Sequence, residues 1–208
     1  GKRIIVTGGA GGIGNAAVRL FAAEGARVAC TFNNAKPEVP AGVPTARCDI
    51  TDKAEVNAVF DQLATALGGL DVLVHAAGRH GSQPAELIGE RDWDAMFDAN
   101  GKATVWTNQA AFRHLRDHGG SIVNMGSMEG VRGFAGNAMY SASRGAVMVQ
   151  FSESAEHRRA TVTRVDGFLV ISGMLGRAPR ADELDAEMTA RDLIAQVRRS
   201  PEYAARVQ

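Results

Sequence analysis

The stretch KRIIVTGGAGGIG, residues 2–14, joins a short apolar run to a cluster of glycines. The β-branched run 4–6 shows no polar alternation, which is typical of a strand buried on both faces. After the glycines, apolar residues recur at helical spacing up to Gly25, where a glycine favours the end of a helix. These residues are Ile13, Ala17, Leu20 and Phe21. A second apolar run at 27–31 completes one predicted strand–helix–strand unit.

The alternation of strands and helices continues along the chain. Further strands are predicted at 45–49, 70–78 and 121–125, and long helices at 92–116 and 140–158. A helix with an apolar face (Val56, Val59, Phe60, Leu63, Leu67) follows the third strand, capped by Thr51 or Asp52. Pro37, Pro40 and Pro44 predict a loop between the second and third strands. Nearly all-apolar strands that alternate with helices predict a doubly wound parallel sheet with helices on both faces.

Size and composition suit one globular domain of 208 residues, 45% of them hydrophobic. Lys plus Arg and Asp plus Glu balance at 23 each, which gives no electrostatic basis for binding nucleic acid or an anionic membrane. No apolar run approaches the length of a membrane span, and the opening GKRIIVTGG lacks the features of a secretion signal. The two cysteines, Cys30 and Cys48, are expected to be buried thiols, and the expected location is the cytoplasm.

The glycine cluster GGAGG, residues 8–12, opens a helix directly after a buried strand. Glycines allow the backbone to approach a pyrophosphate, and a helix N-terminus offers it free N–H groups and partial positive charge. Tight packing alone is the alternative explanation of such a turn. The strand–helix–strand context favours a nucleotide site.

The order of the glycines resembles that of the short-chain dehydrogenase/reductase family: Thr7-Gly8-x-x-x-Gly12-Ile13-Gly14. Later features agree with this family in the right order over residues 3–150. The resemblance implies that Asp49 and Ile50 hold the adenine ring, and that HAAG (75–78), with Ala76, Ala77 and Gly78, stands where the family usually has N-N-A-G. Asn100 stands at the place of a structural and catalytic asparagine. Ser127 precedes Tyr140 by thirteen residues, the family's common serine-to-tyrosine distance.

This resemblance implies a Rossmann-type single domain over residues 1–208, with 1–125 as the nucleotide-binding half and 126–208 as the catalytic and substrate-side half. The region after the second strand, CTFNNAK (30–36), contains no carboxylate to select NAD. Asn33, Asn34 and Lys36 could donate to a 2′-phosphate, so NADP(H) is the favoured cofactor and NAD(H) the alternative. Against this, Gly11 stands where a basic residue is usual, and 33–36 could be only a solvated turn.

The implied chemistry is hydride transfer between nicotinamide and a carbonyl or alcohol carbon of a small molecule. By resemblance, Tyr140 exchanges the proton with the substrate oxygen and Ser127 hydrogen-bonds that oxygen. Free tyrosine titrates near pH 10, and a fixed cation beside it favours the phenolate. In YSASR (140–144) that cation is Arg144 instead of the usual lysine. Arginine keeps the charge and the hydrogen-bond donors but does not give up its proton, so we expect reduced turnover.

Because Arg144 replaces the usual lysine, three functions are considered. The chain is either an active oxidoreductase, or a nucleotide-binding protein with weak or lost catalysis that acts as a sensor or assembly partner, or a family relative that catalyses epimerisation or dehydration. His75 is expected to be a hydrogen-bonded core residue instead of a base. Glu129 and Arg132 face either substrate or solvent. The group Met125, Met128, Phe134 and Met139 lines either a pocket or the core.

The segment RVDG, 164–167, has two interpretations. It is either the strand before the family's Pro-Gly turn, with Asp166 replacing proline, or the family's final strand, which would mean that the substrate lid is missing. The second is slightly favoured, and we expect an abbreviated substrate region. By analogy with relatives, the helices at 92–116 and 140–158 predict a homodimer or homotetramer. No metal site is predicted.

Overall fold

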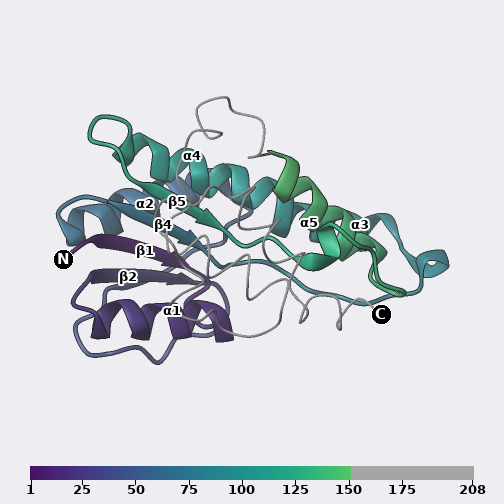
Figure 1. The fold of residues 1–208 in the computed structure, drawn as a ribbon, viewed down its shortest axis with the longest axis horizontal. Coiled ribbons are helices and arrows are strands. Elements are labelled where there is room, and N and C mark those ends of the chain that lie inside the picture. The colour runs from purple at the N-terminus through teal and green to yellow at the C-terminus, as the bar shows by residue number, and fades with distance from the viewer. Residues whose placement is uncertain (151–208) are drawn as a thin grey trace, which may run out of the picture.

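The computed structural model describes residues 1–150, which form a parallel sheet flanked by helices (Figure 1). The strands are β1 (Arg3–Thr7), β2 (Arg27–Phe32), β3 (Thr45–Arg47), β4 (Val72–His75) and β5 (Ser121–Asn124). The helices are α1 (Gly12–Ala23), α2 (Lys53–Leu67), α3 (Glu90–Phe97), α4 (Ala103–Leu115) and α5 (Ala138–Gln150). Short 3₁₀ turns η1 (Ala85–Leu87) and η3 (Met128–Gly130) and a π-helical turn η2 (Asp98–Lys102) complete the elements.

The strand order is β3-β2-β1-β4-β5, and each neighbouring pair is parallel. β1 is therefore the central strand, and the chain reverses its direction of travel across the sheet between β1 and β4. Ligands of doubly wound sheets bind outside the carboxyl ends of the strands at such a reversal. The fold class predicted from the alternation of strands and helices is confirmed for the described residues.

Two apolar layers cover the sheet because successive strand residues point to opposite faces. Ile5 and Leu73 face α2 and α4, where Phe60 is fully buried and contributes roughly 1.5–3 kcal/mol relative to an exposed ring. Ile4 and Val6 face α1, where Val18 is fully buried. Figure 1 shows α1 on one side of the sheet and α2 and α4 on the other.

Local signals account for several element ends. Asp52, not Thr51, caps α2, because its carboxylate accepts hydrogen bonds from the N–H groups of Ala54 and Glu55. Gly68 ends α2 with a φ of 74°, in the left-handed region that glycine adopts without strain. The three-proline segment between β2 and β3 contains no helix, as expected.

Three expectations about the helices were wrong in detail. The predicted helix 92–116 is α3 and α4 separated by the π turn at Asp98–Lys102, a widening that leaves Asn100 buried. Ile13 and Leu20 are 63% and 59% exposed, whereas Ala17 and Phe21 pack with the fully buried Val18 on the inner side of α1, as expected. α5 begins at Ala138, two residues before the expected start.

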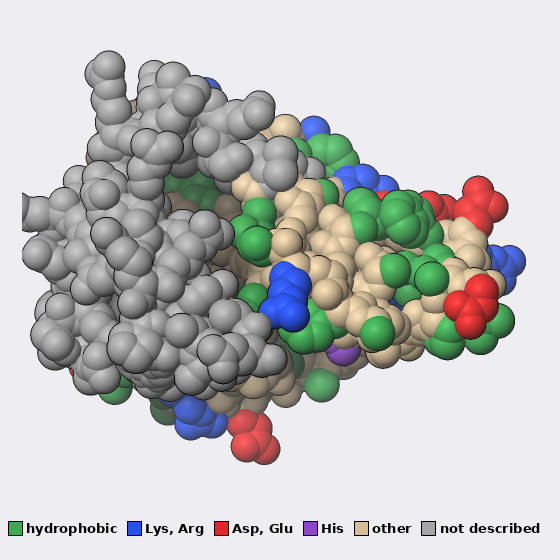
Figure 2. Space-filling model, turned by 45° about the vertical axis from the view of Figure 1, so that its right-hand side comes forward, with side chains coloured by type: hydrophobic (Ala, Val, Ile, Leu, Met, Phe, Trp, Pro, Cys, Tyr) green, Lys and Arg blue, Asp and Glu red, His purple; other side chains and the backbone are tan. Residues whose placement is uncertain are grey.

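Cys30 and Cys48 are free and buried, and burial raises the pKa of their thiols to about 11 and about 12. Within residues 1–150, no helix is long and apolar enough to cross a membrane. On the face in Figure 2, acidic and basic side chains occur near one another at the right-hand end, and hydrophobic side chains form separate groups. The predictions for RVDG, for the substrate region and for the part of helix 140–158 beyond residue 150 fall outside the described residues.

Candidate active site

A cleft of about 700 Å³ lies at the carboxyl ends of β1, β2, β3 and β4. Of the residues predicted to bind a nucleotide, its lining includes Gly8, Asn33, Asp49, Ile50, Ala76, Ala77 and Gly78. Gly12, Ile13 and Gly14 are not part of this lining and form the first turn of α1. Tyr140 and Arg144 also lie outside it, but Gly78 connects the cleft to them, since a Cβ on Gly78 would lie 2.6 Å from Nη2 of Arg144.

The glycine turn brings the backbone of β1 and α1 into close contact. Gly8 has a φ of 73°, and a Cβ on Gly14 would lie 2.2 Å from the carbonyl oxygen of Gly8. The helix cap at Gly11 provides no side-chain acceptor for the first N–H groups of α1. The glycine turn is therefore tightly packed, and the N-terminus of α1 has no side-chain cap. The free N–H groups of such an N-terminus can bind an anion.

At the β2–β3 end of the cleft, Nη2 of Arg47 donates to Oδ1 of Asn33 at 3.1 Å. Arg47 also pairs with Glu55 at 2.9 Å, with its side chain 58% exposed. Sequence reasoning missed this cation, although its place at the end of β3 beside β2 was a usable signal. Asn34 lines the cleft, and Lys36 is exposed but not part of the lining.

Asp49 lies in the turn that follows β3. Its Oδ1 accepts hydrogen bonds from the N–H and the hydroxyl of Thr51 at 2.9 and 2.7 Å. The bond from the hydroxyl, and after it the bond from the N–H, hold the pKa of the Asp49 carboxyl below its ordinary value. The carboxylate therefore stays charged at the edge of the cleft while its own turn satisfies one oxygen.

Asn100 ties three elements together from its buried place in the π turn. Its Oδ1 accepts from the N–H of Arg79 at 2.8 Å, and its Nδ2 donates to the carbonyl of Arg79 at 2.9 Å. The same Nδ2 lies 2.9 Å from Oγ of Ser143 on α5. The loop after β4 is thus held against α5.

Arg144 is 7% exposed and lies at the inner side of α5. Its Nη1 donates to the carbonyl of Met125 at 3.0 Å, and its Nε is buried with no hydrogen-bond partner among the described residues. The guanidinium carbon lies 5.3 Å from the ring centroid of Tyr140. The structure therefore brings a fixed positive charge beside the phenol ring.

Ser127 caps the turn η3, where its Oγ accepts from the N–H of Glu129 at 3.1 Å. The Glu129 carboxylate accepts from Nδ2 of Asn137 at 3.0 Å and also contacts the hydroxyl of Ser141. Glu129 thus links the turn that contains Ser127 to the start of α5. Arg132 and Phe134 are exposed, whereas Met139 is buried.

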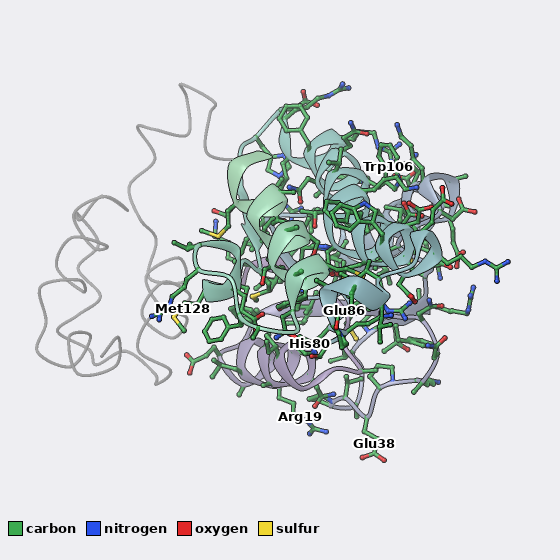
Figure 3. All side chains as sticks on the ribbon, turned by 90° about the vertical axis from the view of Figure 1, so that its right-hand side faces the viewer. Arg19, Glu38, His80, Glu86, Trp106 and Met128 are labelled. Carbon is green, nitrogen blue, oxygen red and sulfur yellow. The ribbon has the colours of Figure 1, made fainter. Side chains whose placement is uncertain are left out.

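Tyr140 is half-buried at the start of α5, and His80 lies against its ring. The ring centroids are 4.6 Å apart and the planes are 67° apart, an edge-to-face contact. His80 is exposed and follows Gly78 by two residues. Figure 3 labels His80 below the start of α5 and Met128 to one side. Sequence reasoning missed His80 because its contact is with a residue sixty positions away.

His75 is buried, and its Nδ1 lies 2.9 Å from the hydroxyl of Thr7 and 3.1 Å from that of Thr107. Burial, and secondarily the charge of Arg144, lowers the pKa of this imidazole to about 3. It is therefore neutral and bound at pH 7, as expected of a core residue. Among the described residues, no group of three or more His, Cys, Asp or Glu side chains could hold a metal ion.

Comparison with known proteins connects this geometry to one family. The family model described as short chain dehydrogenase matches residues 2–183. Short-chain dehydrogenase/reductase ABA4 of Pyricularia oryzae is 32% identical over 180 residues, which are 80% of this chain and 66% of that protein. A hexahydroindene-carboxyl-CoA reductase of Mycobacterium tuberculosis is 35% identical over 161 residues, which are 71% of this chain and 62% of that protein. The chain thus spans less than two thirds of these two relatives.

Among solved structures, a short chain dehydrogenase from Burkholderia cenocepacia in complex with NADP superposes with a TM-score of 0.66. The two sequences are 36% identical, and the superposed region covers 72% of this chain and 65% of the Burkholderia chain. The shared region thus has the same fold at a level of identity where common ancestry is secure.

We expect His75→Asn to weaken the acid sensitivity of folding. The unfolded histidine takes up a proton near pH 6.5, whereas the folded one does so only near pH 3. Its contribution to stability is therefore present above about pH 6.5 and falls by roughly 2 kcal/mol at pH 5. An asparagine does not titrate and can still bind the two threonines. Urea unfolding at pH 7.5 and pH 5 measures the difference, and an equally steep loss in the variant would contradict this account.

Gly14→Ala should destabilise the chain by at least about 1–3 kcal/mol, because the new methyl group overlaps the Gly8 carbonyl. Gly12→Ala is the matched control, since a Cβ there meets nothing within 4 Å. Thermal unfolding of both variants without nucleotide is the measurement. Equal unfolding temperatures would show that the turn is not closely packed.

Proposed function

The chain belongs to the short-chain dehydrogenase/reductase family, and from this premise we propose that it is an NADP(H)-dependent oxidoreductase. It would reduce a small-molecule carbonyl, or oxidise a secondary alcohol, by hydride transfer. The observation that carries the proposal is the contact of the Arg144 guanidinium with the Tyr140 ring, close to the loop that lines the nucleotide cleft.

We assign the nucleotide to the cleft at the strand ends. Its pyrophosphate would lie at the first turn of α1, against Gly8, Gly12, Ile13 and Gly14, where N–H groups lack side-chain caps. The adenine ring would lie beside Asp49 and Ile50. Ala76, Ala77 and Gly78 would lie under the ribose and nicotinamide half, since they lead from the cleft to Arg144.

The preference for NADP(H) is supported by the charges at the β2–β3 end of the cleft. No carboxylate follows β2 within residues 30–36, so a 2′-phosphate would meet no acidic group there. Asn33 offers an amide donor, and its partner Arg47, which also pairs with Glu55, offers guanidinium donors. The Burkholderia cenocepacia relative bound to NADP is consistent with this choice. NAD(H) is the alternative cofactor.

For carbonyl reduction, a bound NADP(H) would supply the hydride. Tyr140 donates its phenol proton to the oxygen, which becomes the hydroxyl, so one hydride and one proton are consumed. Ser127 orients the substrate oxygen, and Arg144 stabilises the phenolate that remains. Asn100 holds the loop and α5 in register instead of contacting the reacting atoms.

Arg144 also supports a second candidate function. Because its guanidinium is bound to the Met125 carbonyl and does not release its proton, it can stabilise charge but cannot carry protons away. A nucleotide-binding protein with weak or lost catalysis, working as a sensor or assembly partner, is the function that this feature favours. The single domain over 1–208, the homodimer or homotetramer and the cytoplasmic location remain predictions from the sequence.

Tyr140→Phe tests the proposed chemistry. The variant should bind NADPH as the parent does, while reduction of a ketone panel falls by about 10²–10⁴-fold because the proton donor is lost. Fluorescence titration with NADPH and NADH measures binding and preference, and the absorbance of NADPH measures turnover. If the parent binds NADPH tightly and turns over no compound, the sensor alternative is favoured.

Arg144→Lys tests the departure from the family pattern. A lysine keeps the positive charge beside Tyr140 and can also exchange protons, so kcat should rise by roughly 3- to 10-fold with NADPH affinity unchanged. Steady-state kinetics at saturating NADPH is the measurement. Arg113→Lys, on the exposed side of α4, is the matched control and should leave kcat unaltered. An unchanged or lower kcat in Arg144→Lys would contradict the account.

A further inference from the structure

His80 is an exposed imidazole whose ring contacts the Tyr140 ring edge-on, with the centroids 4.6 Å apart. The backbone of its neighbour Arg79 donates one hydrogen bond to the Asn100 side chain and accepts another from it. Because Asn100 also donates to Ser143, the loop that presents His80 is fixed relative to α5. The contact is therefore built by the tertiary structure, and the sequence-based site did not include it.

Each reduction in the proposed function leaves Tyr140 without its proton, which must return before the next turnover. Arg144, on the phenol ring, cannot supply it, because a guanidinium stays protonated at all working pH values. His75 is buried and bound by Thr7 and Thr107. The Glu129 carboxylate is bound by Asn137 and Ser141. None of these groups provides a path from the phenol to solvent.

We propose that His80 is the group that returns the proton to Tyr140, an inference that rests on the proposed function. Imidazole is the side chain that changes charge near neutral pH, and His80 is open to water on one side and packed against the phenol on the other. The phenolate takes a proton from the imidazolium through one bridging water, and the imidazole then takes one from solvent. The net reaction consumes one hydride from the cofactor and one proton from water.

The charge that the structure places against this pair is Arg144 on α5, whose guanidinium carbon lies 5.3 Å from the Tyr140 ring centroid. A fixed positive charge at this distance favours the phenolate. His80 thus takes the place in proton exchange that the replacement of lysine by Arg144 leaves open.

The test compares His80→Ala and His80→Phe with the parent at saturating NADPH. His80→Phe keeps an aromatic ring against Tyr140 but carries no proton, so kcat should fall by about 10- to 100-fold in both variants with NADPH affinity unchanged. Free imidazole should restore a large part of the rate of His80→Ala, because the vacated space admits it. A residue that only packs against Tyr140 would not show this rescue. His114→Ala, at an imidazole bound to Asp61 on the α2–α4 side, is the control and should keep the parental kcat.

Parental kcat in His80→Phe, or a slow His80→Ala that imidazole does not rescue, would overturn the inference. Tyr140→Phe separates this failure from that of the proposed function. If Tyr140→Phe is inactive while His80→Phe is fully active, only the role of His80 is wrong. If Tyr140→Phe keeps its activity, the proposed chemistry itself is wrong.

Discussion

The close approach of backbone segments around Gly8 is the constraint on which the rest of the site depends. Gly8 takes a left-handed φ, and a Cβ there would lie 2.8 Å from Cα of Ala77. A Cβ on Gly14 would lie 2.2 Å from the carbonyl oxygen of Gly8, which is too close for any side chain. These contacts join the end of β1, the start of α1 and the loop after β4 at the place where the sheet changes direction. A cleft with an uncapped helix N-terminus follows from that junction.

A second set of contacts, centred on Asn100, connects this cleft to the reacting centre. The π turn directs the asparagine inward, and its amide satisfies both backbone groups of Arg79 while reaching Ser143 on α5. Buried amides that make all their hydrogen bonds rigidify their surroundings, whereas half-satisfied ones destabilise them. The position of the loop after β4 relative to α5 is therefore set by a residue on a third element.

Tyr140 lies between two basic side chains of different character. Arg144 is buried and fixed to the Met125 carbonyl, whereas His80 is exposed and, within residues 1–150, contacts Tyr140 through its ring. The permanent charge of a guanidinium suits stabilisation of a phenolate, and the variable charge of an imidazole suits proton exchange. The two functions that a single lysine can combine are divided here between two residues in our interpretation.

The sequence by itself determined the order of strands and helices, the parallel sheet, the glycine turn and the family, because these depend on local periodicity and on short motifs at fixed spacing. It also indicated that His75 belongs to the core. The tertiary structure alone decided the π turn between α3 and α4, the exposure of Ile13, the pairing of Arg47 with Asn33 and the contact of His80 with Tyr140. Each of these depends on which side chains meet across elements far apart in the chain. Periodicity determines which face of an element is apolar, but not which residue on a neighbouring element it will meet.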